Sequence, residues 1–251
     1  MKRIFLGSFL GTIALAAQVA GPATAADLTR APPAPAPVYT KAPMIAPYSW
    51  TGIYLGGNLG GGWANKCWTN LGTLSTLSLD EGCGTVSGFL GGGQIGGNYQ
   101  ISSFVFGIEG AGDWSNIKGD HISTNAPADT LNAKVDSTAM VTGRIGYAAD
   151  AFLFYGKGGV AWAHDKYSEL FQGASFGNAS EWRAGWTAGA GIEWGFAPSW
   201  SVAFEYDYLG LGTKSVGLVN PTSGTVANFE NVQQNINMAT VRLNYRLFGG
   251  R

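Results

Sequence analysis

Apolar residues recur at every second position in eight separate segments of this chain, and this alternation limits its fold more than any other feature. A period of two places apolar side chains on one face of a β-strand, whereas an amphipathic helix has a period near 3.6. No window beyond Tyr48 shows a convincing helical period. The eight predicted strands cover residues 50–63, 86–100, 104–114, 137–147, 152–162, 182–196, 200–208 and 237–247.

The charged residues of these predicted strands all fall on the phase opposite the apolar one. A soluble barrel or sandwich would bury the apolar phase and leave the charges in water. However, charged residues form only 12% of the chain, against about 25% in a typical soluble domain, and Trp and Tyr gather at strand ends. Both features favour a barrel whose outer surface contacts lipid, as in outer-membrane barrels with aromatic girdles. The barrel interior is then predicted to hold Glu109, Asp113, Arg144, Lys157, Arg183, Glu193, Glu205, Asp207, Arg242 and Arg246.

The connections between the predicted strands alternate in length. Short turns are expected around Ser102, Asp150 and Pro198. Long loops are expected over residues 64–85, 115–136, 163–181 and 209–236. In outer-membrane barrels the short turns face the periplasm and the long loops face outside. The sequence therefore predicts an all-β fold, an eight-stranded antiparallel up-and-down transmembrane β-barrel in the bacterial outer membrane, with both termini in the periplasm.

The N-terminal residues predict export. Lys2 and Arg3 precede an apolar run over residues 4–20, and small residues at 23–25 offer a cleavage site, so residues 1–25 are interpreted as a signal peptide. The run is too interrupted for a membrane anchor of about 20 apolar residues. Residues 26–49 are rich in Pro and Ala and are predicted to form an extended periplasmic tether. Residues 50–248 are assigned to the outer-membrane barrel.

A glycine-rich stretch matches the G-x-G-x-x-G pattern of dinucleotide-binding proteins at Gly91, Gly93 and Gly96. That pattern needs a helix after it, so that the helix N-terminus can receive the phosphates. Here the sequence on both sides is strand-like, so no nucleotide is expected. The net charge is −1 and there is no run of basic residues, so no nucleic acid is expected as a partner.

Several segments together resemble a known family: "WTGIYLGGNLGGGW", "FVFGIEGAGDW", "GWTAGAGIEWGF" and "VRLNYRLF". They are similar to the porin-family, OmpA-like outer-membrane β-barrel proteins, particularly the outer-membrane immunogenic proteins. The resemblance implies a mainly structural role in envelope integrity, with surface-exposed loops. It also implies that the barrel-assembly machinery reads the last strand, here through Val241, Leu243, Tyr245, Leu247 and Phe248.

The predicted interior limits the mechanism. An eight-stranded barrel is only wide enough for side chains to fill it, so the inward charges are expected to form a plug of ion pairs. A narrow path for polar solutes through the same charges is the alternative, which would make the protein a small porin. We find no catalytic constellation and predict neither an enzyme nor a cofactor. The expected partners are outer-membrane lipid and lipopolysaccharide, besides the assembly machinery.

Two further groups of residues suggest more specific chemistry. Cys67 and Cys83 both fall in the first predicted loop, and two cysteines in an exported protein favour a disulfide. A metal pair is the alternative, although their spacing is not that of a zinc motif. Some relatives bind haemin, and here the resemblance implies possible haem contacts at His121, His164 and Tyr167.

Overall fold

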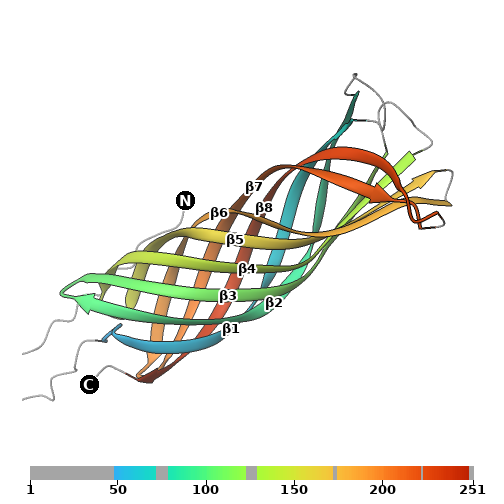
Figure 1. Cartoon of the computed structure of the whole chain (residues 1–251). Coiled ribbons are helices and arrows are strands. Elements are labelled where there is room, and N and C mark those ends of the chain that lie inside the picture. Colours follow the sequence, from blue (N-terminus) through green and yellow to red (C-terminus); the bar gives the residue numbers. More distant parts are fainter. Residues whose placement is uncertain (1–47, 72–78, 123–128, 172–173, 222, 249–251) are drawn as a thin grey trace, which may run out of the picture. The chain divides into compact units, whose positions relative to one another are not determined.

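The structure is a closed antiparallel β-barrel. This computed structural model describes residues 48–71, 79–122, 129–171, 174–221 and 223–248. Each strand pairs with its neighbours in the sequence, and β1 pairs with β8 to close the ring (Figure 1). The strands are β1 (Gly52–Asn70), β2 (Leu79–Ile101), β3 (Phe104–Ile122), β4 (Asp129–Ala149), β5 (Phe152–Phe171), β6 (Ala174–Ala197), β7 (Trp200–Val219) and β8 (Val226–Phe248).

This ring confirms the predicted fold class. Among the described residues there is no helix with the length and apolar character needed to cross a bilayer. The predicted signal peptide, and all of the predicted tether except residues 48 and 49, lie outside the described residues.

The outer face of the barrel is apolar and its inner face is polar over the predicted strand segments. On β1, Ile53 and Leu59 are 48% and 62% exposed, whereas Tyr54 and Asn58 on the alternate phase are buried. The other strands follow the same rule, with outward Ile108, Val141 and Phe204. An outer-membrane barrel requires this arrangement, because its outer surface contacts lipid.

Aromatic side chains form two belts on the outer face. The periplasmic belt lies beside the short turns and consists of Tyr99, Phe104, Tyr147, Phe152, Trp194, Trp200 and Tyr245. The outer belt lies further along the strands and consists of Trp63, Trp114, Trp162, Trp186 and Tyr206. Trp63 and Tyr206 have ring centroids 6.2 Å apart. A transmembrane strand needs about 9–11 residues, and residues 53–63 of β1 meet this length between the belts.

The short turns lie where the sequence predicts them. Residues 102–103, 150–151 and 198–199 connect β2 to β3, β4 to β5 and β6 to β7. Ser102 and Asp150 have φ of 56° and 52°, a left-handed conformation found in tight turns. Each turn is also hydrogen-bonded to a neighbouring strand: the carbonyls of Ser103, Ala151 and Ser199 accept from the amides of Ala148, Gly195 and Arg246.

The four predicted long loops are wrong in extent, because most of their residues belong to strands. For example, β1 continues to Asn70, and β2 already begins at Leu79. Beyond the outer belt the pattern inverts, as expected for a surface that lies outside the hydrocarbon. Apolar side chains such as Leu131 and Val232 point inward, and polar ones such as Lys166 point outward. A rule that expects apolar residues outside cannot detect these extensions.

Candidate functional site

The barrel interior contains a buried network of opposite charges, here called the central network. Arg242 Nη1 lies 2.8 Å from Glu109 Oε1 and 2.7 Å from Glu205 Oε2. Lys157 Nζ lies 2.6 Å from Glu205 Oε1 and 3.1 Å from Asp207 Oδ1. These residues come from β3, β5, β7 and β8, so the network links strands across the interior.

Arg144 extends the central network toward the periplasmic end. Its Nη1 donates to Glu193 Oε2 at 3.4 Å and its Nε donates to Asn98 Oδ1 at 2.8 Å. The guanidinium also lies over the rings of Tyr54 and Tyr155, at 4.8 and 5.0 Å from their centroids. A planar guanidinium suits this position because it can donate hydrogen bonds in its plane and stack on aromatic faces.

Neutral side chains satisfy the carboxylates of the central network further. The Tyr54 hydroxyl donates to Glu109 at 2.7 Å, and the Tyr155 hydroxyl donates to Glu205 at 2.6 Å. Asn244 Nδ2 donates to Glu193 Oε1 at 2.9 Å. Buried charges are tolerated when they are paired and hydrogen-bonded in this way. All eight strands of the barrel contribute to the central network, β2 through Asn98 and β4 through Arg144.

Seven of the ten predicted interior charges belong to the central network: Glu109, Arg144, Lys157, Glu193, Glu205, Asp207 and Arg242. The other three lie elsewhere. Asp113 is buried and accepts a hydrogen bond from Thr138 at 3.4 Å. Arg246 lies at the periplasmic rim, where it donates to the Ser49 carbonyl and lies 4.6 Å from the centroid of the Tyr48 ring.

An apolar layer lies beyond the central network in the direction of the outer belt. Along β8, the inward residues follow in the order Arg242, Thr240, Met238, Ile236 and Gln234, so two apolar side chains separate Thr240 from Gln234. The layer consists of Leu90, Ile117, Met140, Ala161, Leu209, Ile236 and Met238. Leu209 and Ile236 are fully buried, so solvent does not reach the side chains of this layer.

A second polar group, the outer network, lies beyond the apolar layer. Lys66 Nζ is 2.9 Å from Asp165 Oδ1, which also accepts from Gln234 at 3.1 Å. Arg183 donates to the Tyr167 hydroxyl and to Gln234 Oε1, both at 3.3 Å. Arg183 is one of the predicted interior charges. The other members of the outer network fall in the predicted loops, so the sequence did not predict them inside the barrel.

Burial shifts the titration of the outer network, which lies beyond the outer belt. Burial lowers the pKa of Lys66, and the charge of Asp165 opposes part of that effect. Burial raises the pKa of the Tyr167 hydroxyl, and Asp165 raises it further. Both shifts favour the neutral forms of Lys66 and Tyr167, because burial removes the water that would stabilise a charge.

The three residues expected as haem contacts do not lie on one face. His164 is on the outer face of β5, 5.0 Å from the Trp182 ring. Tyr167 is on the same strand but points inward and is buried. His121 is on β3, where its Nε2 is 2.9 Å from the carbonyl oxygen of Glu81. Across the described part of the chain, no group of three or more His, Cys, Asp or Glu side chains is placed to hold a metal ion.

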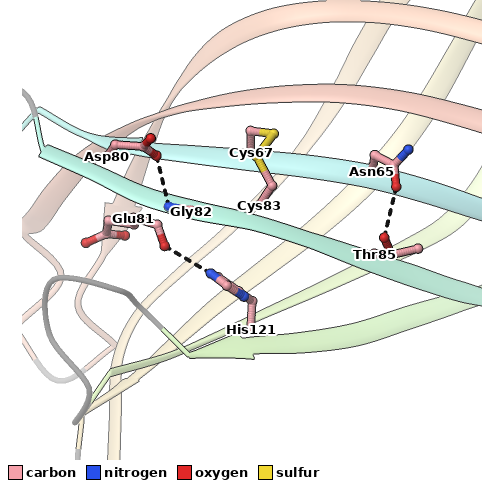
Figure 2. Close-up of a disulfide and its surroundings, with 8 residues drawn as sticks. All are labelled: Asn65, Cys67, Asp80, Glu81, Gly82, Cys83, Thr85 and His121. Atoms are coloured by element: carbon pink, nitrogen blue, oxygen red, sulfur yellow. Dashed lines mark hydrogen bonds between the residues drawn. A yellow bond between two sulfur atoms is a disulfide. The ribbon is translucent and has the colours of Figure 1, made fainter.

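Cys67 and Cys83 form the predicted disulfide, with their Cα atoms 4.0 Å apart (Figure 2). They are direct partners in the β1–β2 ladder, so the bond joins two strands where a loop was expected. Thr85 donates to Asn65 at 2.9 Å on the same face of this hairpin. The disulfide therefore fastens the part of the hairpin that extends beyond the outer belt.

The residues expected to guide assembly lie on β8, which closes the ring. Val241, Leu243, Tyr245 and Leu247 are all exposed on the lipid-facing side. Phe248 is 71% exposed and is the partner of Ile53 on β1. The apolar residues of β8 therefore point outward as predicted, on the strand that closes the barrel by pairing with β1.

Comparison with known proteins bears on this lipid-facing barrel directly. The model of the outer membrane protein beta-barrel domain matches residues 34–247, nearly the whole chain. The chain belongs to this outer membrane β-barrel family. A 31 kDa outer-membrane immunogenic protein of Brucella melitensis is 32% identical over 94% of this chain and 99% of the relative. A 22 kDa outer membrane protein of Rhizobium leguminosarum is 30% identical over 71% of this chain and 72% of the relative.

The membership of the outer membrane β-barrel family confirms the predicted resemblance and the location in the bacterial outer membrane. Among solved structures, the outer membrane protein OprG from Pseudomonas aeruginosa aligns with 80% of this chain and 99% of its own. Its sequence identity is 12% and its TM-score is 0.46. This likeness is too weak to add to the assignment.

Proposed function

We propose that this outer membrane β-barrel is closed to solutes and serves envelope integrity as a structural element. The observation that carries the proposal is the stacking of three filled layers in the interior. The central network, the apolar layer and the outer network follow one another along the inward face of β5 and β8. The proposal assigns no catalytic activity, cofactor, nucleotide or nucleic acid to the protein.

Both kinds of layer oppose the passage of ions. In the central network, the carboxylates of Glu109 and Glu205 already have Arg242 and Lys157 as partners. A permeating ion would have to displace these contacts, and separating a well-buried pair costs about 3–5 kcal/mol. In the apolar layer, an ion would lose its water and meet mostly apolar side chains, which is more costly still.

The remaining surfaces have separate roles in this proposal. The lipid-facing side chains between the belts contact outer-membrane lipid, and the face beyond the outer belt contacts lipopolysaccharide. The barrel-assembly machinery recognises the end of β8. Haemin binding gains no support from the positions of His121, His164 and Tyr167, which point in different directions.

The test is conductance of the refolded chain in a planar lipid bilayer. We expect the wild type and the Arg144→Ala variant both to be silent, because the apolar layer remains intact in each. Adding Ile236→Gly and Leu209→Ala to Arg144→Ala should open both layers and give measurable current. Val141→Ala, which changes only a lipid-facing side chain, is the matched control.

Discrete wild-type current steps that change in size with Arg144→Ala would contradict the closed interior and would identify a porin. The structural role is tested separately in cells. A strain lacking the protein should become sensitive to detergent, and both the wild type and the silent Arg144→Ala variant should restore resistance. Failure of the wild type to restore it would remove the envelope role.

A further inference from the structure

Three lysines lie side by side on the outer face of the barrel, beyond the outer belt. Lys118 on β3 is the direct partner of Lys134 on β4, and Lys134 is the direct partner of Lys166 on β5. Lys134 and Lys166 have side chains that are 43% and 54% exposed. Like charges directly opposite one another destabilise a sheet. The barrel thus maintains a row of cations that its own stability does not require.

One carboxylate partly neutralises this row. Asp136 lies at an irregularity of the β4–β5 ladder, where it contacts Lys134 at 2.7 Å and also Lys166. His164 Nδ1 is 3.7 Å from the same carboxylate. Hydrogen bonds from Lys134 and Lys166 lower the pKa of Asp136, so it stays charged at neutral pH. Each ammonium group has three donors, and Asp136 uses only part of this capacity.

The lysine row lines an open groove of about 840 Å³ across β3 to β6. This volume is in the range typical of small-molecule sites, about 300–1,000 Å³. Besides the lysines, its polar lining consists of Asp120, Asn132, Ser168, Asn178 and Ser180. Amide and hydroxyl groups suit the hydroxyls of a saccharide, and ammonium groups suit phosphate. With Asp120 and Asp136 counted against three lysines, the groove keeps a net positive charge.

The groove lies at a defined height relative to the bilayer. Lys118 is four residues beyond Trp114 on β3, and Lys166 is four residues beyond Trp162 on β5. At about 3.3 Å per residue, this separation is roughly 13 Å along a tilted strand. Because the outer belt marks the edge of the hydrocarbon, the lysines lie in the layer of the outer-leaflet headgroups.

We propose that this groove binds the phosphorylated saccharide headgroup of an outer-leaflet glycolipid, with Lys118, Lys134 and Lys166 contacting its phosphates. The proposal gives the contact with lipopolysaccharide a defined site. It rests on the location in the outer membrane and not on the closed interior, so a conducting barrel would leave it intact. Trp182 lies on the same face of β6 as the groove residue Ser180, with its ring centroid 5.0 Å from that of His164.

The test measures binding of purified lipopolysaccharide to the full chain refolded in a neutral detergent. The ligand is used intact and after chemical removal of its phosphates, and inorganic phosphate is added as a competitor. The variant is Lys118→Gln with Lys166→Gln. The control is Lys214→Gln, which removes an exposed lysine paired with Glu181 at 2.9 Å outside the groove. Folding is checked by the mobility of unheated protein on denaturing gels.

We expect the double variant to bind intact lipopolysaccharide at least about tenfold more weakly than the wild type, a change of about 1.4 kcal/mol. The control should bind as the wild type does. Removing the ligand's phosphates should weaken wild-type binding by a similar factor, and this comparison needs no variant. Equal binding of both ligand forms would overturn the proposal. Displacement by inorganic phosphate at equal concentration would also overturn it, since the groove would then be a general anion site.

Discussion

Glu109 on β3 and Glu205 on β7 are held together by the same two cations, although they come from strands that do not pair. Arg242 Nη1 contacts both carboxylates within 2.8 Å, and Lys157 Nζ lies 2.6 Å from Glu205 and 3.7 Å from Glu109. Two like charges can remain close in the interior only because these shared cations lie between them. The arrangement makes the interior cooperative, since removal of one cation affects both carboxylates.

The first prediction concerns this shared cation. Arg242→Ala should lower the free energy of unfolding by about 3–5 kcal/mol, because Glu109 and Glu205 would lose a buried partner. Urea unfolding of the protein in lipid vesicles measures the change. Lys214→Ala breaks an exposed pair with Glu181 and should cost less than about 1 kcal/mol. Equal effects of the two substitutions would show that burial of the network adds nothing.

The second prediction concerns the buried pair of the outer network. Lys66→Met alone should destabilise the barrel by about 3–5 kcal/mol, because Asp165 would remain buried with Gln234 as its partner. The double variant Lys66→Met with Asp165→Leu should unfold at nearly the same urea concentration as the wild type, since apolar groups of similar volume often replace a buried pair without loss. A double variant as unstable as the single one would contradict this account.

The third prediction follows from the lowered pKa of Lys66, which burial causes. On unfolding, the pKa returns to about 10.4, so the unfolded state binds a proton more readily than the folded state. A group of this kind lowers stability below its folded pKa, and the loss is relieved as the pH rises toward 10.4. We expect the unfolding free energy of the wild type, minus that of the double variant, to rise with pH in this window. If this difference in unfolding free energy did not change with pH, the pKa of Lys66 would not be lowered in the folded state.

The fourth prediction concerns a glycine that an aromatic side chain covers. A Cβ on Gly96 would lie 2.3 Å from the Tyr54 hydroxyl oxygen, which donates to Glu109. Gly96→Ala should therefore displace Tyr54 and destabilise the barrel by about 1–3 kcal/mol. Gly143→Ala is the matched control, because a Cβ there has nothing within 4 Å. It should be neutral or slightly stabilising. The same loss in both variants would mean that strand glycines matter for another reason.

The fifth prediction concerns the disulfide. Cys67→Ser with Cys83→Ser removes a cross-link between residues 16 apart in the sequence, worth about 3 kcal/mol in the chain-entropy model. Amide hydrogen exchange should accelerate at residues 65–69 and 81–85 while exchange around Arg242 stays slow. Exchange that accelerates over the whole barrel would show that the bond supports the membrane-spanning part as well.

The membrane-spanning part of the fold could be predicted because lipid imposes one rule on every strand. With apolar side chains required outside, the phase of Ile53, Val141 or Phe204 fixes the phase of every inward charge. Seven of the predicted charges meet in the central network for this reason. Which cation pairs with which carboxylate depends on the register between the strands around the ring. The alternation of apolar residues shows the phase of each strand and not this register.

The part of each strand beyond the outer belt was not predicted, because apolar side chains point inward there and not outward. On β8, the inward phase there is Val232, Gln234 and Ile236, of which the first and last are apolar. On β5, the inward phase is Ala163, Asp165 and Tyr167, with Asp165 the charged member. A search for alternation in either phase would have found these extensions. It would also have placed Lys66, Asp165 and Arg183 together, since all three lie on the inward phase of this part.

The extension of the strands beyond the outer belt has a consequence for recognition by antibodies. Residues such as Lys118, Lys134 and Lys166 are neighbours in space but come from three different strands. An epitope that includes them exists only in the folded sheet and cannot be reproduced by a short linear peptide. Sera raised against peptides would therefore recognise linear epitopes, and only sera raised against the intact barrel would recognise this folded epitope.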